Sequence, residues 1–319
     1  MRAFAPRPDP VQMIISPDRI RHWSILYATA PLPRGPRVRL RERWLTRLQE
    51  RLLNDCDVIF IRHPKTGGTW FRVLLTHLYS QRYGVSLKRV FKADELWRQD
   101  RRLPRFLITN GRASWERVVA AAFDAGDPRL DDKKIIFMAR HPGDVAVSWH
   151  RQYRKRTKAF KRELLEAEME QPMDFRQLKR FDFVQRPELG LPALIDYHNY
   201  WYRTLSPRDN ALVIRYEDLL EDTVGTLRTV MDFLGESFDE DALRAAADFG
   251  AAENLSRLEH SGYFHNSSLR LRDASDPDTY KVRRARAGGY REDLTPEQAT
   301  WVEAQIDAQL DPGLGYGRT

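Results

Sequence analysis

The chain has 319 residues, of which 42% are apolar and 31% are charged, so it can bury a large core and general disorder is excluded. Lysines and arginines number 53 against 45 aspartates and glutamates, which leaves a formal net charge of +8. A positive excess of this kind indicates an anionic partner. Nucleic acid, an acidic membrane surface and a phosphorylated small molecule all fit, and the bulk charge does not distinguish them.

The cysteine, histidine and hydropathy patterns narrow the class of protein further. With Cys56 as the only cysteine, the chain forms no intramolecular disulfide and no cysteine-based zinc site. The eight histidines have no spacing typical of a metal site, so no metal is expected. No apolar run approaches the roughly 20 residues of a membrane span, and the basic N-terminus lacks the apolar segment of a secretory signal. We therefore expect a cytoplasmic protein without stable membrane insertion.

The N-terminal part of the chain is predicted to be an arm followed by one helix. Roughly the first 20 residues are rich in proline and are expected to be extended, and residues 31–36 are a second irregular stretch. Between residues 38 and 53, leucines and Trp44 recur at helical spacing, which predicts a basic amphipathic helix. Residues 1–56 are accordingly assigned to an N-terminal arm and helix, and residues 57–319 to a single domain.

From residue 57 onward, short apolar runs alternate with helical patterns. The runs are typical of buried parallel strands and lie at residues 57–61, 106–109, 135–138 and 211–214. Helices are predicted at residues 70–83, 145–153, 194–205 and 223–234, and from Pro296 onward. This alternation predicts a three-layer α/β/α fold with a central, mainly parallel sheet. In such folds ligands bind at the carboxyl ends of the strands, so binding residues are expected in the turn after each strand.

The turn after the first predicted strand has the composition of a phosphate-binding loop. Lys65 supplies a positive charge, and Thr66 and Thr69 supply hydroxyl donors. Gly67 and Gly68 allow the backbone to approach an anion closely. The order differs from that of the ATP-binding P-loop, in which the lysine follows the glycines. An NTP-dependent kinase is therefore a disfavoured alternative, and a plain connection between strand and helix is the simplest one.

The third predicted strand leads into a second candidate anion site. Arg140 follows this strand, and Ser148 lies in the helix predicted next. An arginine fork together with a hydroxyl suits a phosphate monoester, because a guanidinium can bind two oxygens at once. The alternative is a surface arginine that pairs with Asp144.

Two further segments follow the same pattern. Residues 282–290, just before the last predicted helix, contain Arg283 and Arg284 next to paired glycines, and the alternative to an anion site is a solvated basic loop. Tyr216 follows the fourth predicted strand. A tyrosine at the end of a strand belongs to the core as often as to a binding site.

These segments occur in the order found in sulfotransferases that depend on 3′-phosphoadenosine 5′-phosphosulfate (PAPS), and the chain resembles that family from about residue 58 to residue 313. Residues 64–70 resemble its 5′-phosphosulfate loop, residues 140–148 its 3′-phosphate motif, and residues 282–290 its late cofactor loop, in which Ala285 and Tyr290 depart from the usual glycine and tryptophan. The resemblance implies a P-loop nucleotide-hydrolase-like fold. It also implies in-line sulfuryl transfer from PAPS to a hydroxyl or amine acceptor, with PAP as product and no metal.

The resemblance also implies roles for individual residues. Lys65 is expected to be catalytic, because its charge can stabilise the oxygen from which the sulfuryl group departs. The cofactor-binding residues are expected to be Lys65, Thr66, Gly67, Gly68, Thr69 and Trp70 on the 5′ side, Arg140, Ser148, Arg283 and Arg284 at the 3′-phosphate, and Tyr216 and Phe249 beside the adenine.

The general base is the point at which the sequence departs most from the family. Asn110 stands where the small-molecule members carry a histidine, and an amide cannot accept the acceptor's proton. The substitutes that the chain offers are Glu116, His150, Asp94 and Glu95. A family member that binds PAP without transferring sulfate therefore stays an alternative.

Residues 151–162 contain seven cations in twelve residues. They form either a solvated face or an electrostatic funnel for PAPS or an acidic acceptor. The expected partner is a small-molecule or glycan acceptor, whose identity the sequence leaves open, as it does the oligomeric state. A nucleic-acid binder is disfavoured because no recognition motif of that kind is present.

Overall fold

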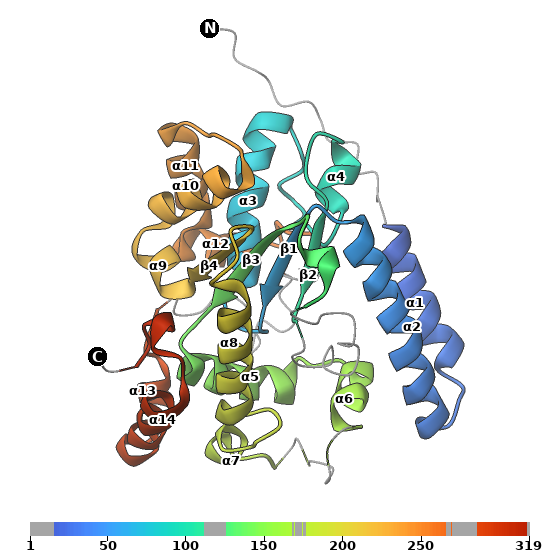
Figure 1. Ribbon diagram of the computed structural model, residues 1–319, viewed down its shortest axis with the longest axis vertical. Helices are drawn as coiled ribbons and strands as arrows, with labels where there is room; N and C mark the ends of the chain where they lie inside the picture. The colour runs from blue at the N-terminus through green and yellow to red at the C-terminus, as the bar shows by residue number, and fades with distance from the viewer. Residues whose placement is uncertain are drawn as a thin grey trace, which may run out of the picture.

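Four parallel strands form the central sheet of the computed structural model (Figure 1). The structure describes residues 16–111, 126–167, 169, 174, 177–265, 269 and 286–317. The strands lie in the order β2-β1-β3-β4, and they are β1 (Val58–Arg62), β2 (Phe106–Thr109), β3 (Lys134–Ala139) and β4 (Ala211–Arg215). In the central register Ile59 pairs with Leu107 of β2 and with Ile135 of β3. All four predicted strands are confirmed to within one residue at each end.

Helices cover both faces of this sheet. They are α1 (Pro17–Thr29), α2 (Arg34–Asp55), α3 (Gly68–Tyr83), α4 (Glu95–Gln99), α5 (Pro142–Lys155), α6 (Ala159–Glu166), α7 (Arg180–Val184), α8 (Leu191–Leu205), α9 (Tyr216–Glu221), α10 (Thr223–Leu234), α11 (Glu240–Gly250), α12 (Ala252–His260), α13 (Tyr290–Asp293) and α14 (Pro296–Gln309). Within the described residues, none of them is both long enough and apolar enough to cross a membrane.

Alternate residues of each strand enter two different cores. Ile59 and Ile61 of β1 pack with residues of α5, α8 and α14, whereas Phe60 packs with residues of α3, α10 and α11. Figure 1 shows these two groups of helices on opposite sides of the sheet. Because side chains of a strand point alternately to its two faces, a continuous apolar run is what a sheet covered on both faces requires. The predicted three-layer α/β/α fold is therefore confirmed.

The N-terminal segment differs from its prediction. Residues 17–20, expected to be extended, begin α1, and α2 starts at Arg34 inside the stretch expected to be irregular. The prolines misled the prediction, because Pro17 and Pro36 lie in first helical turns, where no intrahelical acceptor exists for their missing N–H. In Figure 1 the two helices lie side by side at one edge of the molecule.

An ion-pair cluster connects these helices to the rest of the fold. Glu163 of α6 accepts hydrogen bonds from Arg37 Nε at 2.9 Å and from Arg41 Nη1 at 2.6 Å, both in α2. The buried Arg41 also donates to Thr29 at the end of α1. The helices of the first 56 residues thus pack on the remainder of the chain, and the proposed division at residue 57 stays a prediction.

Candidate functional site

A cavity of about 640 Å³ opens where β1 and β3 end. Several segments that are distant in the sequence meet around it. Most of the residues that were predicted to bind the cofactor line this cavity: Lys65, Gly67, Gly68, Thr69, Trp70, Arg140, Ser148 and Tyr216. This position agrees with the rule that ligands of parallel α/β sheets bind beyond the carboxyl ends of the strands.

The loop between β1 and α3 has two residues in the left-handed backbone region, Lys65 and Gly67. Gly67 adopts φ 92°, and a Cβ atom there would lie 2.5 Å from the ring of Tyr216, so any side chain would strain the loop and clash. Lys65 adopts φ 81°, in the left-handed region that a residue other than glycine rarely occupies. Directly after this turn, the first N–H groups of α3 have no intrahelical acceptor, and the helix dipole favours an anion there.

Thr66 faces into the protein rather than into the cavity. Its side chain is buried, and its hydroxyl donates to the carbonyl of His63 at 2.9 Å. His63 in turn makes a hydrogen bond between Nδ1 and the carbonyl of Pro64 at 2.8 Å, and burial lowers the pKa of His63 to about 3. These contacts hold the loop from its inner side, so the Thr66 hydroxyl is committed to the turn in this arrangement.

Arg140 joins three segments at one point. Its guanidinium lies 4.2 Å from the ring centroid of Tyr216, and it donates to the carbonyls of Lys65 and Arg286, each at 3.2 Å. It also pairs with Asp144 at 3.4 Å, so it both lines the cavity and forms the ion pair considered as the alternative.

Asp144 is a functional residue that the sequence interpretation considered only as a partner of Arg140. It is buried, and its two carboxylate oxygens accept the backbone N–H groups of Gly288 and Tyr290, each at 2.9 Å. The carboxylate therefore holds the end of the C-terminal basic loop against α5. Arg283 and Arg284 of that loop, like Glu116, lie outside the described residues.

The aromatic side of the cavity is formed by Trp70 and Tyr216. Their ring centroids are 5.6 Å apart in an edge-to-face arrangement, and Trp70 Nε1 donates to the carbonyl of Gly250 at 2.8 Å. Phe249, the other predicted aromatic, does not line the cavity and instead stacks on His77 with ring centroids 4.7 Å apart. The small residues after it, Gly250 among them, form the wall in its place.

The candidates for a general base are dispersed. Asn110 lines the cavity and is largely buried. His150 does not line it: Nε2 lies 2.9 Å from the carbonyl of Leu178, the ring packs against Phe183, and burial lowers the pKa of His150. This placement on the far side of α5 argues against His150, because a base must reach the acceptor.

The two acidic candidates on the described chain also lie outside the cavity wall. Asp94 pairs with Arg98 at 2.7 Å. Glu95 accepts the backbone N–H of Lys92 at 3.0 Å, and burial raises the pKa of Glu95. The carboxylates that do line the cavity within the described residues, Asp144 and Asp293, are both ion-paired.

The cavity has a strongly positive lining. Only two of its described residues are carboxylates, whereas many are cationic. The cationic residues are Arg62, Lys65, Arg72, Arg140, Arg151, Arg156, Lys158, Lys161 and Arg286. The basic run at residues 151–162 is thus divided, since some of its cations line the cavity whereas Arg154 and Lys155 do not. Among the described residues, no group of three or more histidine, cysteine or acidic side chains is arranged to hold a metal ion.

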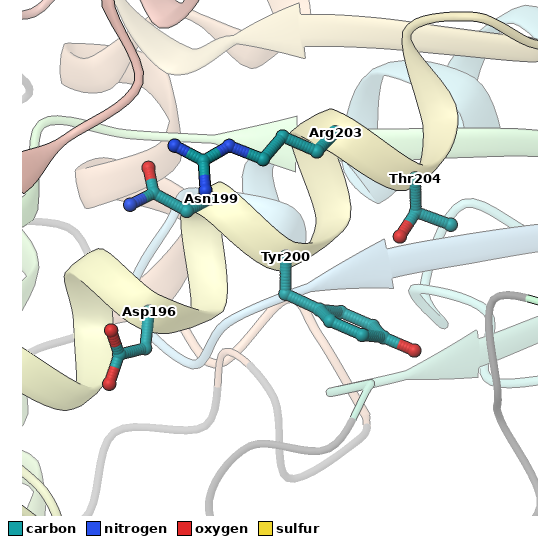
Figure 2. A pocket seen from close by; sticks show the side chains of 5 residues that line it. All are labelled: Asp196, Asn199, Tyr200, Arg203 and Thr204. Atoms are coloured by element: carbon teal, nitrogen blue, oxygen red, sulfur yellow. The ribbon is translucent and has the colours of Figure 1, made fainter.

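A second hollow, of about 420 Å³, lies on one face of α8 (Figure 2). Its side chains all come from this helix, and two of them bind the C-terminal segment. Arg203 Nε donates to Asp311 at 2.8 Å, and Asn199 Nδ2 donates to the carbonyl of Gln309, also at 2.8 Å. This hollow therefore belongs to the packing of the C-terminus and contains none of the predicted site residues.

Comparison with curated proteins identifies several sulfotransferases. The chain is 26% identical over 210 residues to human sulfotransferase 2B1, which covers 60% of this chain and 49% of that protein. It is 23% identical over 284 residues to cytosolic sulfotransferase 12 of Arabidopsis thaliana, which covers 80% and 78% of the two chains. The chain thus spans about half the length of the first relative and more than three quarters of the second.

Solved structures show the same fold. A crystal structure of retinol dehydratase with androsterone and the inactive cofactor PAP has a TM-score of 0.55 at 16% identity, with 79% of this chain and 80% of that chain covered. A mouse sulfotransferase, SULT7A1, complexed with PAP has a TM-score of 0.54 at 15% identity, with coverage of 82% and 87%. These similarities confirm the predicted P-loop-like α/β architecture.

The family assignment rests on the sequence itself. The family model described as the sulfotransferase domain matches residues 55–312, which include every strand of the sheet and the whole described lining of the cavity. The kinase considered as an alternative is not favoured by any of these similarities. The chain belongs to the sulfotransferase domain family.

Proposed function

We propose that this protein transfers a sulfuryl group from PAPS to a hydroxyl or amine group of an acceptor and releases PAP. The observation that carries the proposal is the convergence of two anion-binding turns and an aromatic wall on one cavity. The PAP complexes of similar folds support PAPS as the donor. Relatives named as cytosolic sulfotransferases support a cytoplasmic location.

The residues of the cavity fit such a donor. Gly67 permits the left-handed turn and leaves room for the Tyr216 ring, and the N–H groups that follow it can bind an anion. Lys65 and the N-terminus of α3 would hold the 5′ phosphosulfate. Arg140 and Ser148 would hold the 3′-phosphate, together with Arg283 and Arg284. The rings of Trp70 and Tyr216 offer a surface to the adenine.

The chain's own contribution to the reaction is positioning and charge. PAPS supplies the sulfuryl group and a stable leaving group. Lys65 would stabilise the negative charge that develops on the departing oxygen, and fixed backbone N–H groups at the start of α3 would add to this without reorganisation. Arg140 holds the carbonyl of Lys65 at 3.2 Å and so couples the two anion-binding turns.

The general base that would act on the acceptor is not among the residues with a clear role in the cavity. Asn110 cannot act as a base, so we propose that Glu116 is the acidic candidate to test first, because Asp94, Glu95 and His150 lie away from the cavity wall. The androsterone and retinol complexes of similar folds support a small-molecule acceptor, and the positive lining leaves a glycan open.

Labelled sulfate transfer and PAP binding test the proposal together. Lys65→Ala should lower kcat about 100-fold or more, because one electrostatic donor to the transition state is lost. Arg140→Ala should weaken PAP binding by calorimetry about tenfold or more, because a charge-assisted contact is lost. Arg154→Ala removes an exposed arginine of α5 outside the cavity and should leave both measurements unchanged. Absence of PAP binding in the unaltered protein would refute the proposal.

A further inference from the structure

We infer that the exposed face of α1, together with the arginines of α2, binds an anionic membrane surface. The inference goes beyond the proposed sulfuryl transfer and does not depend on it. It starts from the exposed large apolar side chains of the described residues, which are Ile20, Trp23 and Tyr27. All three belong to α1, and we name them the apolar ridge.

The apolar ridge is one continuous row. Its residues follow one another at spacings of three and four, which places them on the same side of the helix. The ring centroids of Trp23 and Tyr27 lie 5.9 Å apart, and Tyr27 is 73% exposed. Single exposed apolar side chains are ordinary in soluble proteins, but a row of three indicates a binding surface.

The packing of α1 does not require this row. Leu26 and Thr29 are buried and Ile25 is half-buried, so the helix attaches to the rest of the fold by another face. On that face the buried Arg41 of α2 donates to the Thr29 hydroxyl at 2.9 Å. A surface helix normally has polar residues on its outer face. Because α1 has apolar residues on both faces, the outer row fits a partner rather than the fold.

The charge of the two N-terminal helices indicates a partner that carries anions. Residues 17–55 contain nine arginines and four acidic residues, a net charge of +5. Asp55 is the one exposed acidic residue of this segment, all of which the structure describes. The exposed arginines are Arg21, Arg34, Arg39, Arg43, Arg47 and Arg51. Asp18 pairs with Arg21 and Asp55 pairs with Arg51, so these pairs leave the surface with a positive excess.

This charge distinguishes a membrane from a second copy of the chain. Two copies that met at their apolar ridges would bring two sets of arginines together, and like charges repel. Anionic lipid headgroups would instead attract the arginines. Tryptophan and tyrosine also favour the level of the headgroups, because their rings are apolar and carry one polar group.

The position of α1 gives the geometry of such binding. The helix has 13 residues, too few to span a bilayer, so it would lie in the plane of the headgroups. Lys158, which lines the large cavity, lies 4.9 Å from the ring centroid of Trp23. A bilayer bound at the apolar ridge would therefore lie beside the cavity.

Vesicle binding by the full-length protein tests this inference without PAPS. We expect the protein to co-sediment with phosphatidylcholine vesicles that contain about one third phosphatidylglycerol at least about tenfold better than with phosphatidylcholine alone. Raising the salt to about 0.5 M should remove most of this difference, because salt screens exposed charges. Absence of binding to both kinds of vesicle, or equal binding to both, would overturn the inference.

A ridge variant tests the apolar contribution. Ile20→Ser/Trp23→Ser/Tyr27→Ser should lower partitioning into the anionic vesicles about tenfold or more, because the apolar area that enters the headgroup region is lost. The control Ser24→Ala/Ala28→Ser changes exposed residues of α1 outside the row and should leave partitioning unchanged. Circular dichroism checks that each variant is folded. A folded ridge variant that binds as well as the control would contradict the inference.

Two arginine pairs test the contribution of charge. Arg39→Gln/Arg43→Gln should lower affinity for the anionic vesicles about fivefold or more. Arg228→Gln/Arg244→Gln removes two exposed arginines from α10 and α11 and should lower it by less than about twofold. Equal effects of the two pairs would show that net charge alone attracts the vesicles. A dimer in sedimentation velocity that the ridge variant abolishes, without vesicle binding, would assign the apolar ridge to a second copy instead.

Discussion

Gly67 shows how one residue determines whether the anion-binding loop can form. Its φ of 92° is strained for any other residue, and its missing side chain makes room for the ring of Tyr216. That ring in turn lies against Arg140 and beside Trp70. A single backbone position therefore connects the 5′ loop to the proposed 3′-phosphate and adenine contacts.

Gly67→Ala should lower PAP affinity about tenfold or more and lower the free energy of unfolding by about 1–3 kcal/mol, because it adds backbone strain and displaces Tyr216. The matched control is Gly262→Ala: Gly262 has φ 70°, and a Cβ atom there would meet nothing within 4 Å. The control should lose stability alone. Calorimetric PAP titration and urea unfolding separate the two effects, and equal losses of PAP affinity in both variants would contradict this account.

At the scale of single residues, the sequence predicted correctly which positions line the cavity where the path of the backbone decides this. The Lys65, Gly67 and Arg140 positions follow from the turn after each strand, and all three line the cavity. Thr66 and Phe249 were predicted to do so as well, yet the Thr66 hydroxyl binds the His63 carbonyl and Phe249 stacks on His77. The direction of a side chain depends on partners from tertiary packing, which motif spacing does not specify.

At the scale of elements, a partly buried carboxylate connects the N-terminal helices to a helix of the cavity wall. Glu163 of α6 pairs with Arg37 and Arg41 of α2, and the side chain of Arg41 is only 7% exposed. Burial lowers the pKa of Arg41, whereas Glu163 opposes this effect. Because α6 also carries Lys161, the contact joins α2 to the cavity wall.

Glu163→Gln should lower the free energy of unfolding by about 1–3 kcal/mol, because it leaves Arg41 buried without its counter-charge. Glu240→Gln is the control, since Glu240 is exposed and pairs with the exposed Arg228 and Arg244. That variant should lose less than about 1 kcal/mol. Urea unfolding of both variants measures the difference. Similar losses of unfolding free energy would show that the Glu163 ion pairs do not specifically stabilise the contact between α2 and α6.

The short apolar strands and the helices with regular apolar spacing could be predicted from the sequence, whereas helices without such a pattern could not. The helix over residues 223–234 agrees with α10 at both ends, because its apolar spacing is regular and Gly235 ends it. The shorter α11 was missed, although Asp239 caps it by accepting the N–H of Ala242. Aspartate is common in turns as well as at helix N-termini, so a capping residue alone does not predict a helix. A short helix of this kind is stabilised mainly by the surface on which it packs, which the sequence does not show.

At the scale of the whole molecule, part of the charge that first indicated an anionic partner is concentrated around one cavity. Beneath that cavity the fold buries uncharged histidines. Burial lowers the pKa of His63 to about 3 and the pKa values of His141 and His198 to about 4. His63 lies in the β1–α3 loop, and His198 packs against Phe137 of β3, so protonation would place charge in that loop and against the sheet.

These histidines should make the fold sensitive to acid. Between pH 6.5 and about pH 4 the unfolded chain binds protons that the folded chain excludes, so the free energy of unfolding should decrease as pH falls through this range. At pH 5 each histidine should cost up to about 2 kcal/mol relative to pH 7. Urea unfolding at pH 7.5, 6 and 5 measures the slope. His198→Phe, which replaces one of the three with an apolar ring, should reduce that slope. If His198→Phe leaves the pH dependence of the unfolding free energy unchanged, carboxylates rather than buried histidines cause the loss of stability in acid.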